Sequence, residues 1–134
     1  MTIESRGARI LLVDDDAAVA KALAAMLSRA GHAVTTSMNT AEAEGLLEEP
    51  FDALVVDLRM PGMRGDALYY LACIRQPALA RRTLFISGDI TDAAAQIVRG
   101  TGCALLLKPF RSEEFLAAVT ALLPDTALRV PRAG

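Results

Sequence analysis

Four short apolar runs in this sequence end in polar side chains that could act together on one ligand. In chain order, the runs end at the acidic triplet 14–16, at Asp57, at Ser87 and at Lys108. If these runs are parallel strands of one sheet, their carboxyl ends meet at a single edge, which is where such sheets bind ligands. Carboxylates, a hydroxyl and an ammonium group together suit a divalent metal ion and a phosphoryl group.

The acidic triplet favours a metal site. Asp14 and Asp15, close to Asp57, would repel one another strongly without a cation. Ligands that are all oxygen suit Mg²⁺, for which Mn²⁺ could substitute. The structural alternative is that one acid caps the following helix, and Asp16 fits that role as well as it fits the metal. We therefore predict Asp14 and Asp15 as metal ligands and leave both roles open for Asp16.

Asp57 is the predicted nucleophile. A carboxylate can attack phosphorus to give an aspartyl phosphate. The Ser87 hydroxyl could then donate to one phosphoryl oxygen, and the Lys108 ammonium could neutralise another. The alternatives are an Asp57 that merely starts a turn and a Lys108 whose stem is buried while its ammonium reaches water. The bond from Lys108 to Pro109 could be cis.

Hydrophobic patterning predicts the strands and helices that would position these side chains. Gly31 ends the first helix, Asn39 with Glu42 resembles a capping box for the second, and Ser112 is a candidate cap for the last. The predicted strands lie near residues 9–13, 33–36, 52–56, 83–86 and 104–107, and the predicted helices lie near residues 17–30, 40–48, 64–75, 91–100 and 112–123.

The alternation of these elements indicates an α/β fold. Because each gap between strands holds a helix, the strands should form one parallel sheet with helices on both faces. The run 33–36 is more polar than the others, so we expect it at an edge of the sheet. The other four runs are almost wholly apolar, which is typical of strands covered on both faces.

Size and composition exclude several classes of function. The chain has 134 residues, enough for one domain, with 14 basic and 16 acidic residues and a net charge of −2. It has no basic run, which argues against direct binding of nucleic acid. It has neither a signal peptide nor an apolar stretch of about 18 residues, so we expect no membrane span and a cytoplasmic location. Cys73 and Cys103 lack metal-ligand spacing and are predicted to be reduced core thiols.

The motifs together resemble the receiver domain of two-component response regulators. The resemblance covers about residues 8–123 and rests on Ile-Leu-Leu-Val-Asp14-Asp15-Asp16, on Val-Val-Asp57-Leu-Arg-Met-Pro-Gly-Met-Arg-Gly, on Ser87 in Phe-Ile-Ser-Gly, and on Lys108-Pro109-Phe110. It implies a flavodoxin-like (βα)5 fold, with a five-stranded parallel sheet in the order 2-1-3-4-5. The domain would span 8–124 between flexible termini at 1–7 and 125–134.

The same resemblance implies a chemistry for the site. A histidine kinase or a histidine phosphotransfer protein would donate a phosphoryl group to Asp57, in a reaction that the receiver itself largely catalyses. Mg²⁺ would be held by Asp15, Asp57 and the backbone carbonyl of Arg59, with Asp14 acting mainly through water. The residues implied to bind the phosphoryl group are Leu58, Arg59, Ser87, Gly88 and Lys108. Phosphorylation would then switch contacts with a downstream protein, in a monomer or in a homodimer that phosphorylation induces.

Two features depart from the family's pattern or extend it. Leu105 stands three positions before the lysine, where receivers usually carry an aromatic residue or histidine, so the loop 88–91 could carry more of the switching. Arg59 and Asp89 could pair across the site and screen attacking water, although two solvated loop charges explain them equally well. His32, the only histidine, is predicted to be a surface residue and not a phosphoryl relay.

Other functions are weaker fits to the sequence. The triplet contains the D-x-D spacing of haloacid-dehalogenase-type phosphatases, but Ala18 stands where Thr or Val is expected and no acidic pair follows Lys108. A flavin-binding electron carrier would need a phosphate loop after the first strand, where three aspartates would repel the phosphate. A receiver that works without phosphate is a further alternative. Met1 favours a free-standing receiver, whereas the motif around Lys108 is similar to receivers fused to hybrid kinases.

Overall fold

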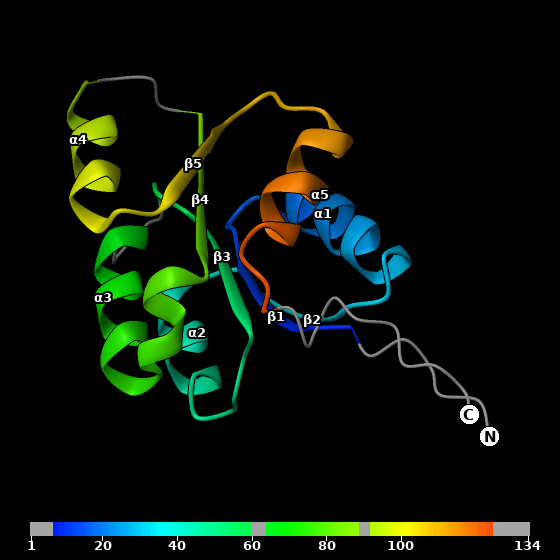
Figure 1. Cartoon of the computed structure of the whole chain (residues 1–134), viewed down its shortest axis with the longest axis horizontal. Helices are drawn as coiled ribbons and strands as arrows, with labels where there is room; N and C mark the ends of the chain where they lie inside the picture. The colour runs from blue at the N-terminus through cyan, green and yellow to red at the C-terminus, as the bar shows by residue number, and fades with distance from the viewer. Residues whose placement is uncertain (1–6, 60–63, 89–91, 125–134) are drawn as a thin grey trace.

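The computed structural model describes residues 7–59, 64–88 and 92–124, with the side chains of 92–95 left aside. Five parallel strands form one sheet in the order β2-β1-β3-β4-β5. The strands are β1 (Arg9–Val13), β2 (Ala33–Ser37), β3 (Ala53–Asp57), β4 (Thr83–Ser87) and β5 (Ala104–Leu107). The helices are α1 (Ala17–Arg29), α2 (Thr40–Leu46), α3 (Gly65–Arg75), the short 3-10 helix η1 (Pro77–Arg81), α4 (Asp92–Thr101) and α5 (Ser112–Thr120). The predicted flavodoxin-like fold and strand order are confirmed (Figure 1).

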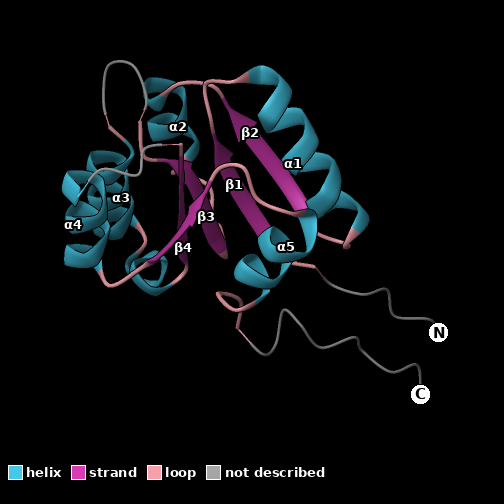
Figure 2. Cartoon of the chain, turned by 90° about the horizontal axis from the view of Figure 1, so that it is seen from above, coloured by secondary structure: helices cyan, strands magenta, loops and turns pink. Residues whose placement is uncertain are grey.

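The helices form two layers on opposite faces of the sheet. α1 and α5 cover one face, and α2, α3 and α4 cover the other (Figure 2). Side chains along each strand alternate between the two faces. In β4, for example, Ile86 packs in the core beneath α1 and α5, whereas Phe85 packs in the core beneath α2 and α3. The sheet therefore separates two apolar cores.

The edges of the sheet differ from the prediction on one side. β2 is an edge strand, as its polarity predicts. β5 is the other edge, and the prediction that it is covered on both faces is wrong, because Ala104 is exposed and Leu107 is 41% exposed. The apolar run 104–107 was typical of a buried strand, but a strand with a neighbour on one side only receives less cover from the helices. The residues on either side of Lys108, Leu107 and Pro109, are thus exposed.

Two of the predicted helix caps are present. Asp16 caps α1, since its Oδ1 accepts the N–H groups of Ala18 at 3.0 Å and Val19 at 3.2 Å. Asn39 caps α2, with Oδ1 accepting the Glu42 N–H at 2.8 Å. Glu42 does not complete the capping box, because its carboxylate accepts from the Ser37 hydroxyl at 2.8 Å. 

The predicted cap of α5 is wrong. Ser112 is the first residue of the helix, and its hydroxyl bonds to the Glu113 carboxylate at 3.2 Å. The residue before it, Arg111, occupies the cap position, and its N–H donates to Glu114 Oε1 at 2.9 Å. A glutamate at the third helical position thus takes over the capping, which an argument from Ser112 alone could not anticipate.

Three further sequence predictions can be compared with the structure. His32 is half-buried and not simply a surface residue, because its Nδ1 accepts the Ala8 N–H at 3.0 Å beside the start of β1. Cys73 and Cys103 are free and half-buried at the margin of the core. Within residues 7–59, 64–88 and 92–124, no helix has the length and apolar character to cross a membrane. The termini predicted to be flexible fall, apart from Gly7, outside the described residues.

Candidate functional site

The ends of four strands bring the predicted site residues together. β1 pairs Val13 with Val56 of β3, so Asp14 lies beside Asp57 at the carboxyl edge of the sheet. On the other side, β4 pairs with β3 and ends at Ser87. β5 pairs with β4, and Lys108 follows its last residue, Leu107. The convergence predicted from parallel strands is therefore what the fold produces.

Asp57 is held in place through both of its carboxylate oxygens. It is the last residue of β3 and is only 6% exposed. Its Oδ1 accepts the backbone N–H of Arg59 at 3.0 Å, and its Oδ2 accepts from Lys108 Nζ at 3.1 Å. Both oxygens therefore have fixed directions before any ligand binds, which is how a nucleophile is kept in an attacking orientation.

Lys108 connects the two buried carboxylates. Its Nζ lies 3.2 Å from Asp14 Oδ2 and 3.1 Å from Asp57 Oδ2, and its backbone N–H donates to the Ser87 carbonyl at 2.8 Å. Burial by itself lowers the pKa of Lys108, but the hydrogen bond and charge of Asp57, together with those of Asp14, outweigh it and raise the pKa above its usual value. The peptide bond to Pro109 is cis.

Asp14 is the most buried acid of the site. It is fully buried, and its Oδ1 accepts the Asp16 N–H at 2.9 Å. Burial raises the pKa of Asp14, and the charge of Asp57 adds to that effect, while the Asp16 N–H and Lys108 act in the opposite direction. The net pKa is above the ordinary value, so the carboxylate form of Asp14 depends on nearby positive charge.

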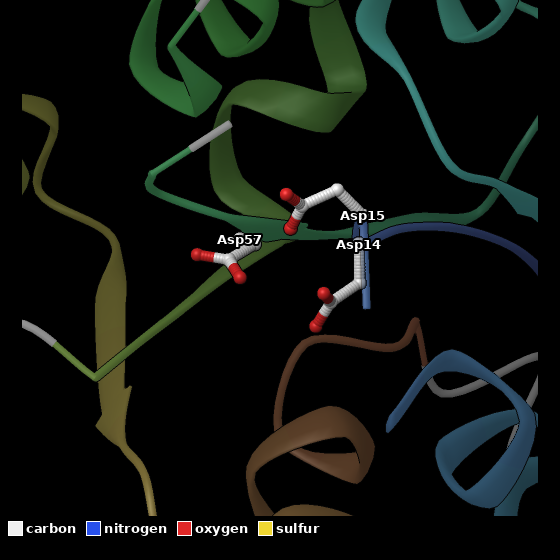
Figure 3. A group of neighbouring side chains, drawn as sticks. All are labelled: Asp14, Asp15 and Asp57. Atoms are coloured by element: carbon white, nitrogen blue, oxygen red, sulfur yellow. The ribbon is translucent and has the colours of Figure 1, made fainter. Parts of the chain in front are cut away.

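Three carboxylates form a cluster that fits a hard divalent cation. Asp14, Asp15 and Asp57 each offer an oxygen atom, and these atoms all lie within 4.8 Å of one another. Figure 3 shows the three carboxylates extending from the carboxyl ends of β1 and β3 into the same space. Three acids against one lysine leave an excess of negative charge at a largely buried place, which a divalent ion bound through oxygen would balance.

The residues predicted to bind the phosphoryl group are not equally well placed for it. Ser87 is fully buried at the end of β4, and Gly88 beside it is exposed, with open space where a side chain would stand. The Arg59 N–H already points at Asp57 Oδ1. The Leu58 N–H instead donates to the Ile86 carbonyl at 2.9 Å and its side chain is buried, so Leu58 has less to offer a ligand.

Of two expected features of the site's surroundings, one can be placed and one cannot, and the structure adds a hollow that was not predicted. Leu105 is half-buried in β5 and packs against the core beneath α2 and α3, so an aliphatic side chain stands where the resemblance led us to expect an aromatic residue or histidine. Lys108, Pro109 and Phe110 line a mainly apolar hollow of about 280 Å³ against α1. Asp89, the predicted partner of Arg59, lies outside the described residues.

Gly65 is a site residue that the sequence reasoning missed. A Cβ atom there would lie 2.2 Å from the Asp57 carbonyl oxygen, and the Gly65 N–H donates to the Leu58 carbonyl at 3.1 Å. The start of α3 therefore packs directly on the backbone that carries the nucleophile. The available signal in the sequence was a glycine at the predicted start of a helix. Glycine disfavours helix formation, so its presence there indicates a close approach of another part of the backbone.

Comparison with known proteins defines the class to which this fold and site belong. The family model described as "response regulator receiver domain" matches residues 10–120. The chain therefore belongs to the response regulator receiver domain family of two-component systems. Membership of this family leaves no support for the phosphatase and flavin-carrier alternatives.

Curated relatives are much longer than this chain. It is 33% identical over 126 residues to the sensory/regulatory protein RpfC of Xanthomonas campestris pv. campestris, covering 90% of this chain and 17% of that protein. It is 34% identical over 114 residues to the response regulator protein FleR of Pseudomonas aeruginosa, covering 84% of this chain and 24% of that protein. The chain thus spans between about a sixth and a quarter of these relatives.

Solved structures share the fold. A CheY-like receiver domain protein from Methanospirillum hungatei superposes with a TM-score of 0.79 at 24% identity, over 86% of this chain and 92% of that one. A response regulator from Burkholderia pseudomallei, solved with a phosphorylated aspartic acid, a calcium ion and citrate, has a TM-score of 0.75 at 34% identity, over 83% of this chain and 65% of that one.

Proposed function

We propose that Asp57 accepts a phosphoryl group from a histidine kinase or a histidine phosphotransfer protein, with Mg²⁺ bound at the acidic cluster. The observation that carries the proposal is the position of Lys108 Nζ, within 3.2 Å of Asp14 and 3.1 Å of Asp57. A half-buried lysine between two acids suits a reaction in which negative charge arrives at one of them. The similar response regulator protein from Burkholderia pseudomallei, solved with a phosphorylated aspartic acid and a calcium ion, supports this assignment.

The chemistry is a phosphoryl transfer between two nucleophiles. One carboxylate oxygen of Asp57 forms a bond to phosphorus while the bond from phosphorus to the donor's imidazole nitrogen breaks, and that nitrogen leaves with the electron pair. Lys108 and the Arg59 N–H orient the Asp57 carboxylate, and Lys108 then neutralises a phosphoryl oxygen. The Ser87 hydroxyl donates to another phosphoryl oxygen.

The residues that would hold the metal ion are Asp15, Asp57 and the backbone carbonyl of Arg59, with Asp14 acting mainly through water. When bound, Mg²⁺ supplies charge neutralisation between the carboxylate and the incoming phosphoryl oxygens. A role for Mn²⁺ in its place stays a prediction. Gly88 leaves room for the phosphoryl group beside Ser87, since a Cβ atom there would meet nothing within 4 Å.

In this mechanism, phosphorylation of Asp57 changes the contacts that the domain makes with other proteins. The apolar hollow between α1 and the segment 108–110 adjoins Lys108, so it can seat an apolar part of the phosphodonor protein next to the nucleophile. Leu105 has no ring to reorient, and the loop 88–91, which we predicted to carry more of the switching, lies beyond Gly88 outside the described residues. The downstream protein, a switch between monomer and homodimer, and the cytoplasmic location stay predictions.

The experiment that tests the proposal is intact-mass measurement after incubation with acetyl phosphate, with and without Mg²⁺. We expect wild type to gain one phosphoryl group only when Mg²⁺ is present, and Asp57→Asn to gain none. A panel of phosphorylated histidine kinases extends the test to protein donors. Absence of an adduct with acetyl phosphate and with every kinase would overturn the proposal and leave a receiver that works without phosphate.

A further inference from the structure

Two free cysteines flank one tyrosine on the side of the sheet covered by α2, α3 and α4. The Tyr69 hydroxyl donates to the Ala80 carbonyl at 3.0 Å, and Cys103 Sγ donates to the same carbonyl at 3.3 Å. Cys73 follows Tyr69 by one turn of α3, and residues four apart lie on the same helical face. Burial raises the pKa of the Tyr69 hydroxyl, and hydrogen bonding and charge from Cys103 and Cys73 add to that effect. Cys73 and Cys103, from distant parts of the sequence, are therefore neighbours across one hydroxyl group.

Both thiols lie where a small oxidant can reach them. Each cysteine is half-buried and neither forms a disulfide. Cys103 stands in the turn between α4 and β5, where its N–H donates to the Thr101 hydroxyl at 3.1 Å. The turn includes Gly102 at a φ of 75°, a conformation that suits glycine. The position of Cys103 is thus fixed by its own turn as well as by Ala80.

We propose that Cys73 and Cys103 form an intramolecular disulfide when the protein meets a hydroperoxide. One thiol reduces the peroxide O–O bond and becomes a sulfenic acid, with release of water or an alcohol. The second thiol then attacks the sulfenic sulfur, the S–S bond forms, and the sulfenic oxygen leaves as water. Two thiols are oxidised by two electrons and one hydroperoxide is reduced, so the step balances.

The bond would join α3 to the turn that leads into β5. β5 continues to Lys108, so oxidation would tie the start of that strand to the helix layer at the opposite end from the acidic cluster. The inference rests on neither Asp57 nor the bound metal ion, and it holds or fails independently of the proposed phosphoryl transfer.

The experiment compares wild type with a variant that keeps two thiols but moves one of them. In the double variant Cys73→Ser, Ile74→Cys, the α3 thiol shifts by one residue to a position that is 78% exposed. One residue corresponds to a rotation of about 100° around a helix, so this thiol is more accessible but faces away from Cys103. If proximity in the fold controls disulfide formation, wild type reacts faster. If accessibility alone controls it, the double variant reacts at least as fast.

Both proteins are treated with hydrogen peroxide at mildly alkaline pH, because burial raises the pKa of Cys73. They are then alkylated and digested with trypsin without reduction. Arg75, Arg81, Arg82 and Arg99 separate the two cysteines, so their peptides stay together only if the disulfide has formed. Intact mass separates an intramolecular bond from a dimer, and dithiothreitol should restore two alkylatable thiols.

We expect wild type to give the linked peptides, a monomeric mass lower by two hydrogen atoms, and a rate at least about tenfold above that of the double variant. Circular dichroism of the reduced proteins checks that both are folded. The inference is overturned if wild type yields only sulfinic acid or intermolecular dimers. It is equally overturned if the displaced thiol reacts with Cys103 as fast as Cys73 does.

Discussion

A side chain at Gly65 would collide with the residue that carries the nucleophile, since a Cβ atom there would lie 2.2 Å from the Asp57 carbonyl oxygen. We predict that Gly65→Ala destabilises the domain by about 1–3 kcal/mol and slows phosphorylation, because β3 and α3 must move apart. Urea unfolding and acetyl phosphate labelling measure the two effects.

The matched control is Gly45→Ala in α2, where a Cβ atom would meet nothing within 4 Å. Because alanine is the better helix former, this change should stabilise by about 0.5–1 kcal/mol and leave labelling unchanged. Equal effects at the two glycines would show that the close approach to Asp57 is not what constrains residue 65.

A metal ion bound at the acidic cluster would compete with Lys108 for the same acids. Its Nζ contacts Asp14 Oδ2 and Asp57 Oδ2, so Lys108→Met should free both oxygens and tighten Mg²⁺ binding by about tenfold, or ~1.4 kcal/mol. Phosphorylation should fall at the same time, because the ammonium no longer neutralises the phosphoryl group. Isothermal titration with Mg²⁺ measures the affinity, and labelling by acetyl phosphate measures phosphorylation. The control is Lys21→Met, at an exposed position of α1. A loss of both Mg²⁺ binding and labelling would contradict this account.

Two adjacent aspartates should respond differently to the same change. Asp15 belongs to the carboxylate cluster, whereas Asp16 caps α1 through Ala18 and Val19. Asp15→Asn should weaken Mg²⁺ binding by at least about tenfold, because one anionic ligand is lost. Asp16→Asn should leave Mg²⁺ binding and stability nearly unchanged, because asparagine caps helices as well as aspartate does. Calorimetric titration of both variants checks this, and equal losses of affinity would contradict it.

His32 should make stability depend on pH in the mildly acidic range. Burial lowers the pKa of His32 from 6.5, with the charge of Asp52 acting in the opposite direction. The unfolded chain therefore binds the proton more readily than the folded protein, and stability falls as the pH drops below about 6.5. Protonation also removes the Nδ1 acceptor of the Ala8 N–H.

The comparison variant is His32→Asn, whose amide oxygen can accept the same N–H without titrating. Urea unfolding at several pH values between about 7.5 and 5.5 should show a smaller loss for His32→Asn than for wild type. Carboxylates elsewhere affect both proteins equally, so the difference isolates His32. Parallel pH profiles would rule this residue out as the cause.

The parts of the site that could be predicted from sequence are those that depend only on strand ends. Asp14, Asp57 and Lys108 each follow or close an apolar run, and parallel strands bring such positions to one edge whatever the details of packing. Their contacts in the structure follow from that rule. The caps by Asp16 and Asn39 are likewise local, because the acceptor and donors lie within three residues.

What could not be predicted depends on neighbours distant in sequence. Leu107 is exposed because β5 has no further strand beside it, which the apolar run alone does not reveal. His32 is half-buried where its Nδ1 accepts the N–H of Ala8, a residue just before β1 and distant in sequence. The closeness of Gly65 to Asp57 arises because α3 begins against the end of β3, and a glycine in the sequence does not by itself specify this contact.

The two cores of this domain share the strand that ends at Ser87. Adjacent residues of β4 point to opposite faces, with Phe85 beneath α2 and α3 and Ile86 beneath α1 and α5. Close-packed cores transmit displacement instead of absorbing it. A movement of β4 that repacks one helical layer must therefore strain the other, so the two outer surfaces of the domain cannot change independently of each other.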